Sequence, residues 1–344
     1  MAPTPPSIAI CTFQTLFTTG GAELHVSALE RELRERGYRV EVVRLPFSWE
    51  KADLLQQALV WRMIRVEADL VIATNFPSYF VKHDNKVVWL FHQHRQLYEL
   101  YGTAFSAFGN DPGDAEIRQI VTDADTRFVQ EARRIFATSR NVADRLRRYN
   151  GLVAEPLYHP PPLFRSLHCK EYDDFIFMPT RFEAHKRPEL FVEALRLSRS
   201  KIKGVLAGRG PMENDLRRRV SDYGLADRVH FAGFVDASQL VDLYARCRAV
   251  MYAPFDEDYG YVTLEAFSAK KPVISTPDSG GVLEFVADGT TGLIADPTPE
   301  ALAGAIDRLA ESPDLCRRLG EAGHTRVRSI SWNDVVERLV GHAR

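Results

Sequence analysis

The sequence predicts an α/β protein of two doubly wound domains, each built on a mostly parallel sheet. Short apolar runs, typical of buried strands, alternate with segments whose apolar residues recur at helical spacing. This alternation occurs twice within 344 residues, a length that suffices for two separate cores. Pro156 and the three prolines of residues 160–162 stand between the two series, where neither a helix nor a central strand could continue. We therefore expect a linker there.

The first series of elements ends near residue 150. Apolar runs predict strands at residues 8–13, 38–45, 70–73, 87–91 and 135–137. Helical periodicity predicts helices at residues 22–33, 51–66, 114–132 and 141–149. Gly37 marks the end of the first helix, because glycine readily takes the left-handed conformation that closes helices. Alternating strands and helices imply a parallel sheet that is covered on both faces.

The second series begins after the prolines. It predicts strands at residues 175–178, 204–207, 229–232, 249–252 and 273–276. Helices are expected from Pro188, which suits a first helical turn, and at residues 211–224, 262–269, 300–310, 314–323 and 333–342. We place one Rossmann-like domain at residues 1–158, a second at 159–326, and a final helix at 327–344 that crosses back to the first. Ligands of two such domains would bind in a cleft lined by the carboxyl ends of both sheets.

The composition excludes several classes of protein. With 45% hydrophobic and 26% charged residues, the chain is typical of globular proteins. A net charge of -2 and a pI of about 6.6 argue against a nucleic-acid-binding protein. The four cysteines are widely separated, which disfavours both a disulfide framework and a zinc site and indicates reduced thiols.

Targeting and membrane-spanning segments are not apparent in the sequence. The first residues lack the charged and apolar parts of a signal peptide. No apolar run approaches the roughly 20 residues needed to cross a bilayer. The sequence therefore predicts a cytoplasmic protein that at most touches the inner face of the cell membrane.

Residues 257–265 form the most informative segment, with a glutamate at each end and a glycine between them. The segment follows one predicted strand and opens a predicted helix. Gly260 lets the backbone approach a ligand closely. The amides of Val262 and Thr263, at the helix start, can face a phosphate, and the two carboxylates can accept hydrogen bonds from sugar hydroxyls. The plainer alternative is two surface acids near the start of a helix.

Two further features fit a phosphate ligand. Arg181 and Lys186 lie five residues apart after the first strand of the second series, where two cations can neutralise a diphosphate and stabilise its charge as it departs. The alternative is a solvated charged loop. Gly20 and Gly21 occupy the corresponding turn of the first series, where they either allow close approach of a ligand or form an ordinary tight turn.

Together these features resemble glycosyltransferase family 4, whose members have the GT-B fold of two Rossmann-like domains and retain the anomeric configuration. The resemblance covers nearly the whole chain and is most specific between residues 177 and 296. The matching motifs are residues 178–181 with Lys186, the Gly-x-Gly-Pro turn of residues 208–211, residues 231–235, the Glu-x7-Glu signature of residues 257–265, and residues 280–284, 288–289 and 291–293.

The resemblance implies roles for individual residues. The first domain would bind the acceptor and the second the donor. Arg181 and Lys186 would hold the leaving diphosphate in place of a metal ion, Glu257 would contact hydroxyls of the donor sugar, and Glu265 would bind the ribose. The other residues expected at the donor are Gly20, Gly21, Gly208, Phe234, Val235, Tyr259, Gly260, Tyr261, Val262 and Thr263.

The first half is the less typical one, but family members often have a histidine after its fourth strand. Here His92 is the preferred candidate for positioning the sugar or stabilising positive charge at the anomeric carbon, and His94 is the alternative. A metal site at this His-x-His pair is disfavoured, because no third ligand candidate lies nearby. The acidic triplet of residues 256–258 has a metal-binding pattern, but one used by a single-domain transferase fold.

One position departs from the family pattern. Many members have a glycine two residues before the proline of the strand that follows the Glu-x7-Glu helix, and this sequence has Lys270. A glycine would suit a left-handed helix end, so we expect a different termination here.

We therefore predict a metal-independent, retaining glycosyltransferase that needs no cofactor. It would move a hexose-type sugar from a nucleotide diphosphate donor, in the UDP or GDP form, to a hydroxyl of a glycan or lipid-linked glycan, as in polysaccharide biosynthesis. Six arginines within residues 133–148 form either a solvated face or a surface that docks on an anionic membrane. Two alternatives remain, a nucleotide-sugar 2-epimerase of the same fold and a non-catalytic nucleotide-sugar-binding protein.

Overall fold

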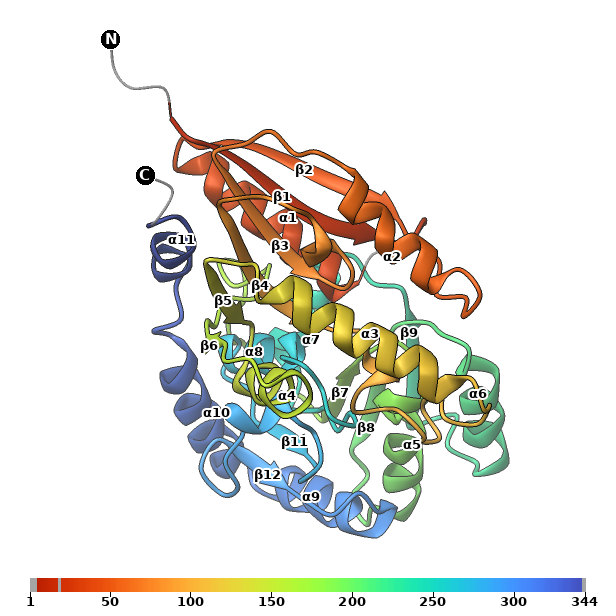
Figure 1. Cartoon of the computed structure of the whole chain (residues 1–344). Helices are drawn as coiled ribbons and strands as arrows, with labels where there is room; N and C mark the ends of the chain where they lie inside the picture. The colour runs from red at the N-terminus through yellow and green to blue at the C-terminus, as the bar shows by residue number, and fades with distance from the viewer. Residues whose placement is uncertain (1–4, 18–19, 342–344) are drawn as a thin grey trace. The chain divides into compact units, whose positions relative to one another are not determined.

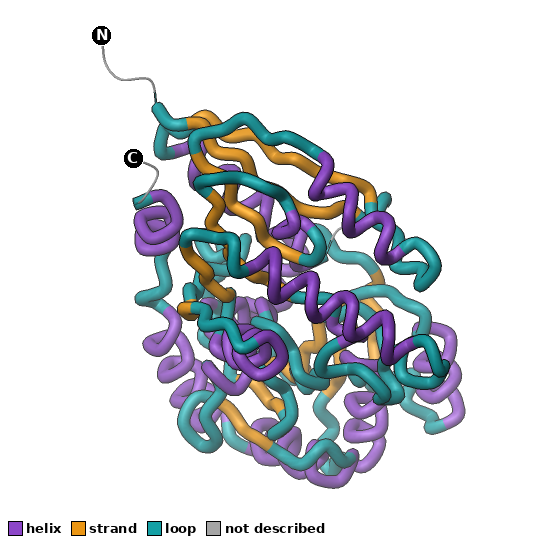
Figure 2. Tube along the Cα trace, viewed as in Figure 1, coloured by secondary structure: helices purple, strands orange, loops and turns teal. Residues whose placement is uncertain are grey.

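A computed structural model of the chain describes residues 5–17 and 20–341. The chain forms two compact units: unit 1 comprises residues 1–162 and 330–344, and unit 2 comprises residues 163–329. Within the described residues, each unit contains one six-stranded parallel sheet with helices packed on it (Figure 1). Figure 2 shows the strands and helices alternating along the chain, as the sequence predicts.

The sheet of unit 1 has the strand order β2-β1-β3-β4-β5-β6. Its strands are β1 (Ser7–Gln14), β2 (Arg39–Pro46), β3 (Leu70–Asn75), β4 (Lys86–His92), β5 (Arg134–Ala137) and β6 (Glu155–Pro156). Its helices are α1 (Gly21–Glu35), α2 (Leu54–Met63), α3 (Asp114–Val129), α4 (Arg140–Asn150) and α11 (Trp332–Val340), with the short 3-10 helices η1 (Ser78–Phe80) and η2 (Arg95–Leu97).

Both faces of this sheet are covered, so its central strand β3 is buried along its whole length. One face carries an apolar cluster to which α2, α3 and α4 contribute Trp61, Phe128 and Leu146. On the other face, Trp89 of β4 packs against Trp332 of α11, with 6.2 Å between ring centroids. A strand covered on both sides has a near-continuous apolar sequence, which explains the apolar run at residues 70–73.

The sheet of unit 2 has the strand order β12-β11-β10-β7-β8-β9. Its strands are β7 (Phe175–Pro179), β8 (Lys203–Ala207), β9 (Val229–Gly233), β10 (Ala249–Met251), β11 (Val273–Ser275) and β12 (Gly292–Ile294). Its helices are α5 (Pro188–Leu197), α6 (Glu213–Asp222), α7 (Ala237–Arg246), α8 (Tyr261–Ser268), α9 (Pro299–Glu311) and α10 (Pro313–Val327), with the 3-10 helices η3 (Ala184–Lys186) and η4 (Gly281–Glu284).

Two strands and one α-helix of the structure were not predicted. Strand β6 consists of a glutamate and a proline, and β12 begins with a glycine, residue types that are depleted in strands. Helix α7 has a recognisable start, because Asp236 caps the helix and Gln239 completes a capping box with it. That pair of residues is the signal by which the helix could have been found.

The end of α8 corrects the expectation for Lys270. Its φ angle is 56°, so the lysine takes the same left-handed conformation that a glycine would favour. Gly320 packs closely against this turn, since a Cβ atom there would lie 1.9 Å from the Lys270 carbonyl oxygen. The position is therefore held by its neighbours at a cost of roughly 1–2 kcal/mol for a residue with a side chain.

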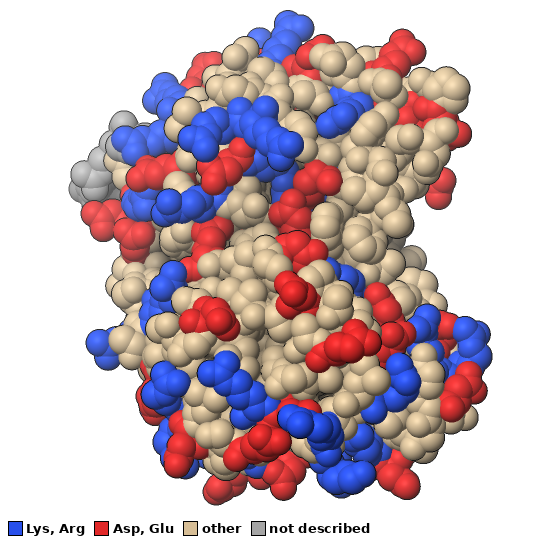
Figure 3. All heavy atoms as spheres, turned by 90° about the horizontal axis from the view of Figure 1, so that it is seen from below, with Lys and Arg blue, Asp and Glu red and all other residues tan. Residues whose placement is uncertain are grey.

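The distribution of charges, the state of the cysteines and the length of the helices can be read from the structure. Acidic and basic side chains are interspersed over the face shown in Figure 3. All four cysteines lie in the described residues and are unpaired there. None of the described helices has the length and apolar character required to cross a membrane.

Candidate functional site

The strand order of unit 2 reverses between β7 and β10. The chain continues from β7 to β8 on one side and from β10 to β11 on the other, so the loops that leave these neighbouring strands diverge. Ligands of doubly wound sheets bind at such a switch point, outside the carboxyl ends of the strands. The loop after β7 carries Arg181 and Lys186, and the loop after β10 carries Glu257.

Lys186 and Glu257, predicted separately, are brought together as an ion pair. The ammonium group of Lys186 donates a hydrogen bond to the Glu257 carboxylate. Both side chains are shielded from water, with 10% and 14% of their surfaces exposed. Because a shielded charge is costly unless it is paired, this ion pair stabilises both residues.

Arg187 supports the loop of the candidate site, and the sequence analysis missed it. Its guanidinium donates two hydrogen bonds to the Asp278 carboxylate, at 3.1 and 2.8 Å. Burial alone would raise the pKa of Asp278, but the hydrogen bond from Arg187 brings it below its ordinary value. The signal was a third cation directly after Lys186, at the residue before a helix-starting proline. This pair ties the loop after β7 to the segment after β11.

Arg181 is the accessible cation of the loop. Its side chain is 54% exposed and forms an ion pair with Glu183 at 2.9 Å. An exposed pair of this kind contributes about 0–1 kcal/mol. The guanidinium can therefore exchange Glu183 for a phosphate at little cost.

The Gly-x-Gly-Pro turn supports the loop that carries Arg181. A Cβ atom on Gly208 would lie 1.9 Å from the Thr180 carbonyl oxygen, and one on Gly210 would lie 2.5 Å from the Phe182 carbonyl oxygen. The amide of Phe182 donates to the Arg209 carbonyl oxygen at 2.9 Å. Only glycine permits such a close approach. The observed role of Gly208 is therefore to pack against the loop that carries Arg181.

The loop that carries Glu257 is held by the segment after β11. The Glu257 amide donates to the Ser279 carbonyl oxygen at 3.2 Å, and the Gly281 amide donates to the Glu257 carbonyl oxygen at 2.7 Å. Gly280 has a φ of 61°, and a Cβ atom there would lie 2.6 Å from the Glu257 carbonyl oxygen. The backbone beneath the acidic side chain is thus fixed on both sides.

Gly260 is the N-cap of α8, with φ 79° and ψ 65°. One of the two amides predicted to face a phosphate is already used, because the Thr263 amide donates to the Gly260 carbonyl oxygen at 3.0 Å. The Val262 amide keeps the predicted position at the start of the helix. The buried Thr263 hydroxyl has no hydrogen-bond partner among the described residues, and a buried polar atom of this kind is one that a bound ligand could satisfy.

Glu265 lies one turn further along α8 and is buried. The Tyr244 hydroxyl of α7 donates a hydrogen bond to its Oε2 atom at 2.7 Å. Burial raises the pKa of Glu265 to about 7. A carboxyl group with a displaced pKa at a switch point is typical of a functional site, although Tyr244 already occupies one oxygen.

The aromatic candidates occupy two different environments. Tyr259 is buried, and its ring lies 5.7 Å from that of Tyr261 and 5.8 Å from that of Phe285, so it forms part of the packed wall. Phe234 follows β9 and is 81% exposed, and Val235 beside it is half-buried. An exposed phenyl ring at a strand end offers a flat surface to a base.

In unit 1, a cavity of about 350 Å³ lies at the carboxyl end of β1. Its lining is largely polar and consists of Thr12, Phe13, Gln14, Glu23, Leu24, Val26, Ser27 and Arg44. Gly20 is the N-cap of α1, and its amide donates to the Glu23 carboxylate at 2.8 Å. Gly20 and Gly21 therefore begin the helix that forms one wall of this cavity.

The two candidate histidines differ in surroundings. His92, the last residue of β4, is half-buried, and its ring centroid lies 6.0 Å from that of the cavity-lining Phe13. His94 is buried among aromatic rings, 5.2 Å from Trp49 and 5.5 Å from Phe76. Burial lowers the pKa of His94 to about 4. These surroundings favour His92 as the residue that can reach a ligand.

Metal-ligating side chains do not cluster in the described residues. No group of three or more His, Cys, Asp or Glu side chains suited to a metal ion occurs there. Metal independence remains a prediction that a binding measurement must test.

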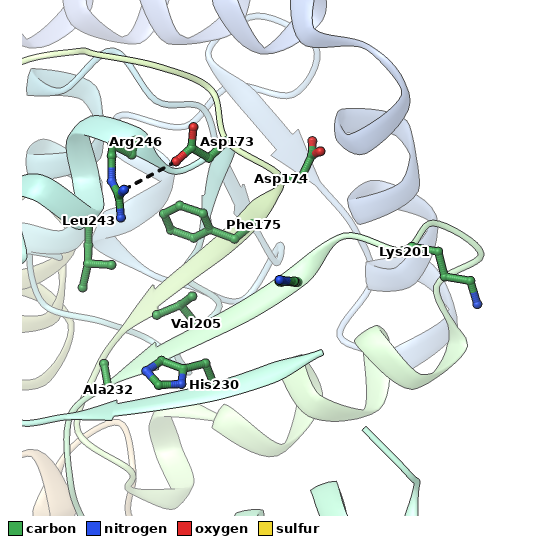
Figure 4. Close-up of a pocket in the computed structure, with 10 residues that line it drawn as sticks. Asp173, Asp174, Phe175, Lys201, Val205, His230, Ala232, Leu243 and Arg246 are labelled. Carbon is green, nitrogen blue, oxygen red and sulfur yellow. Dashed lines mark ion pairs between the residues drawn. The ribbon is translucent and has the colours of Figure 1, made fainter. Parts of the chain in front are cut away.

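A larger cavity of about 620 Å³ in unit 2 is lined by none of the predicted site residues. Figure 4 shows its apolar floor, formed by Phe175, Val205, Ala232 and Leu243. Arg246 and Asp173 form an ion pair at 3.8 Å beside it (Figure 4). Phe175 opens β7, so the cavity lies at the opposite end of this strand from Arg181. Volume alone does not identify a site, whereas converging polar groups do.

The sequence of unit 2 matches the model of a described family. Residues 162–326 match the model of glycosyl transferases group 1. Curated relatives include alpha-D-kanosaminyltransferase of Streptomyces kanamyceticus, 34% identical over 41% of this chain and 37% of that protein. The human alpha-1,3/1,6-mannosyltransferase ALG2 is 30% identical over 43% of this chain and 39% of that protein. The chain thus spans under half the length of these two relatives.

Solved structures resemble the chain over nearly its whole length. Sucrose-phosphate synthase from Thermosynechococcus elongatus has a TM-score of 0.77 at 19% identity and covers 97% of both chains. Anabaena Alr3699/HepE in complex with UDP-glucose has a TM-score of 0.76 at 17% identity and covers 98% of both chains. These likenesses confirm the predicted fold class of two Rossmann-like doubly wound domains of the GT-B type.

Proposed function

We propose that this protein, whose unit 2 is a glycosyl transferases group 1 domain, transfers a hexose-type sugar from a nucleotide diphosphate sugar to a hydroxyl acceptor. It would do so as a member of glycosyltransferase family 4, with retention of configuration and without a metal ion. The observation that supports this most strongly is the meeting of Lys186 and Glu257 at the switch point of unit 2. A shielded ion pair is weak evidence of a purely structural role, because apolar residues of similar size often stabilise a fold equally well.

The ion pair suggests how a donor is accepted. A diphosphate carries more negative charge than one carboxylate, so it would draw the Lys186 ammonium away from Glu257. The released Glu257 carboxylate then accepts hydrogen bonds from sugar hydroxyls. Arg181 exchanges Glu183 for the same diphosphate. The two cations thereby stabilise the charge that grows on the leaving group, a contribution that commonly amounts to about 2.7–4 kcal/mol per donor.

The retaining step needs no group from the protein to form a covalent bond. The bond between the anomeric carbon and the diphosphate oxygen breaks, and the acceptor hydroxyl attacks the same face of the sugar. The departing phosphate oxygen takes the hydroxyl proton. His92 accepts a hydrogen bond from the donor sugar, and Glu265 accepts hydrogen bonds from the ribose. Closure around the donor would exclude water and limit hydrolysis.

The donor base is proposed to be uracil or guanine. Two of the similar solved structures are complexes of Alr3699/HepE with UDP and glucose or with UDP-glucose. The exposed ring of Phe234 and the neighbouring Val235 offer the base an apolar contact. The segment 257–265, matching the Glu-x7-Glu signature in order and spacing, supports membership of family 4.

A glycan or lipid-linked glycan is proposed as the acceptor, with the protein in the cytoplasm and at times at the inner face of the membrane. On α4, Arg140, Arg147 and Arg148 are exposed, but Arg147 already pairs with Asp144 at 2.9 Å. Co-sedimentation with anionic and neutral vesicles tests this part. Equal recovery in the pellet with both vesicle types, or none with either, would count against electrostatic docking.

The function itself is tested by following donor turnover by NMR. UDP-glucose and GDP-mannose are incubated with the protein, with and without EDTA and a mixture of short glycans and lipid extract. We expect the nucleoside diphosphate and a sugar product in the donor's own anomeric form, with no effect of EDTA. A free 2-epimeric sugar without transfer would indicate the epimerase, and an unchanged but bound donor would indicate a binding protein.

A further inference from the structure

Four polar side chains in unit 1 form a continuous chain of hydrogen bonds. The Tyr98 hydroxyl donates to the Asp125 carboxylate at 2.5 Å. The Asn150 side-chain amide donates to the Tyr98 oxygen at 3.3 Å. The Gln93 side-chain amide donates to the Asn150 side-chain oxygen at 2.6 Å. This chain of hydrogen bonds therefore runs from the second half of α3, through the residue after η2 and the end of α4, to the residue after β4.

This chain of hydrogen bonds lies in the interior of unit 1. Asp125 and Gln93 are fully buried, Tyr98 is nearly so, and Asn150 is 8% exposed. Burying such groups costs free energy unless they are hydrogen-bonded. Apolar side chains of the same size would often serve stability as well. A buried polar chain instead fixes geometry, because its hydrogen bonds are directional.

The chain of hydrogen bonds ends beside His92, the histidine proposed to contact the sugar. The Nδ1 atom of His92 lies 2.9 Å from the backbone carbonyl oxygen of Gln93. A carbonyl oxygen only accepts hydrogen bonds, so in the neutral ring Nδ1 carries the proton and Nε2 is the acceptor. The side chain of the same residue, Gln93, is anchored by Asn150. The residue that sets the tautomer is therefore itself held by the buried chain.

We propose that Gln93, Asn150, Tyr98 and Asp125 are positioning residues that fix the ring orientation and tautomer of His92. They would present Nε2 as a hydrogen-bond acceptor to a hydroxyl of the donor sugar. The inference rests on the proposed function, in which His92 contacts that sugar. The place of the ring suits the task, since it lies against Phe13, which lines the cavity at the end of β1.

Two measurements on the whole chain test the proposal. Protein carrying ¹⁵N-histidine gives the imidazole shifts of His92, assigned by their loss in His92→Ala, and donor turnover gives kcat and KM separately. The test variant is Gln93→Met, which keeps the length of the side chain but cannot donate to Asn150. The matched control is Val142→Ala, which removes buried apolar atoms from α4 but none of the four hydrogen-bonding side chains.

The parent should show one neutral tautomer with the proton on Nδ1. In Gln93→Met we expect shifts averaged between the two tautomers and a kcat lowered about ten- to a hundred-fold, as small misplacements of catalytic groups allow. The KM for the donor should stay within about two-fold of the parent value. Val142→Ala should leave tautomer and kcat as in the parent, although it lowers stability.

Several outcomes would overturn the proposal. These are a parent tautomer with the proton on Nε2, a Gln93→Met protein with parental shifts and kcat, or a Val142→Ala protein that shows the same changes. If Gln93→Met does not fold, Tyr98→Phe interrupts the chain while keeping the ring, and the same shift in tautomer is expected. If the parent turns over no donor, the proposed function fails, while the tautomer spectra still decide whether the chain positions His92.

Discussion

Three cations of one loop, Arg181, Lys186 and Arg187, are held in different ways, and the differences suggest different duties. Arg187 forms a bidentate ion pair with Asp278, which is the strongest of the three interactions. It is therefore expected to hold the loop rather than to contact the donor. Lys186 forms an ion pair with Glu257. Arg181 is exposed, so its ion pair with Glu183 is the one most easily replaced by a contact with a ligand.

Removing the Lys186 charge should impair catalysis more than binding. In Lys186→Met we expect kcat for donor turnover to fall by about 10²–10³, since one preorganised electrostatic contact with the leaving group is lost. The control is Arg217→Ala, which removes an exposed arginine of α6 that pairs with Glu213. A Lys186→Met enzyme with parental kcat would remove this residue from the mechanism.

Glu265 gives stability a distinctive dependence on pH. Its folded pKa of about 7 lies above the ordinary value of 4.5, because burial disfavours its charged form. The folded state therefore holds this proton more tightly, and the resulting stabilisation, complete below about pH 4.5, is lost as pH rises to about 7. A shift of this size corresponds to on the order of 3 kcal/mol.

The prediction is checked by comparing chemical unfolding of the parent and Glu265→Gln from pH 4.5 to 8. Glutamine keeps an acceptor for the Tyr244 hydroxyl but cannot ionise. As pH rises across this range, the parent should lose up to about 3 kcal/mol of its free energy of unfolding relative to the variant. A difference that does not change with pH would contradict the buried, ionisable role of Glu265.

Individual residues also mark the limit of what a sequence can predict. Lys186 and Glu257 could be singled out from residue type and position, but their ion pair depends on the strand order of unit 2. The use of the Thr263 amide by Gly260, and the left-handed backbone of Lys270, arise from tertiary packing that no local pattern encodes. Arg187 was recoverable from its position beside Lys186.

The loops after β7 and β8 act as one element, because backbone hydrogen bonds and close glycine contacts join them. Thr180 and Phe182 donate from their amides to the carbonyl oxygens of Ala207 and Arg209, both at 2.9 Å. Gly208 lies against the Thr180 carbonyl. The position of Arg181 is thus determined by a neighbouring turn.

A pair of glycine substitutions separates packing from conformational freedom. In Gly208→Ala, the new Cβ atom would clash with Thr180, and the φ of 145° is unfavourable for alanine. We expect a loss of about 1–3 kcal/mol in stability and weaker binding of the nucleoside diphosphate. Gly304 lies within α9 with no atom within 4 Å of an added Cβ, so Gly304→Ala should stabilise by about 0.8–1 kcal/mol.

Chemical unfolding of both variants provides the measurement. Opposite signs of the two changes are expected, with nucleoside diphosphate binding impaired only in Gly208→Ala. Equal effects of the two substitutions would mean that the turn at Gly208 has no special role in holding the loop.

Most elements could be predicted because their burial leaves a clear pattern. The first four residues of the buried strand β3 form a continuous apolar run. Pro188 occupies the first turn of α5, as expected. Helix α7 was missed although Asp236 and Gln239 form its capping box. Strand β12 was missed because it begins with a glycine, which is depleted in strands.

Taken as a whole, the chain combines one half with a strong family signal and one with little. Unit 2 matches the group 1 model and contains the charged residues expected to hold a diphosphate. Unit 1 shares the fold of known structures but offers a polar cavity of about 350 Å³ without a motif. A diphosphate demands cations and tight turns, which sequence reveals, whereas an acceptor is recognised by a shape that many residue combinations can form.

The measurement that tests the central claim most directly is thermal unfolding with UDP, GDP, ADP and TDP, each with and without EDTA. A diphosphate present at 100 times its Kd should stabilise the chain by about 2.7 kcal/mol. We predict that UDP or GDP raises the midpoint, that EDTA leaves the rise unchanged, and that Lys186→Met reduces it. No rise with any diphosphate, or a rise that EDTA abolishes, would contradict the metal-independent nucleotide-sugar transferase.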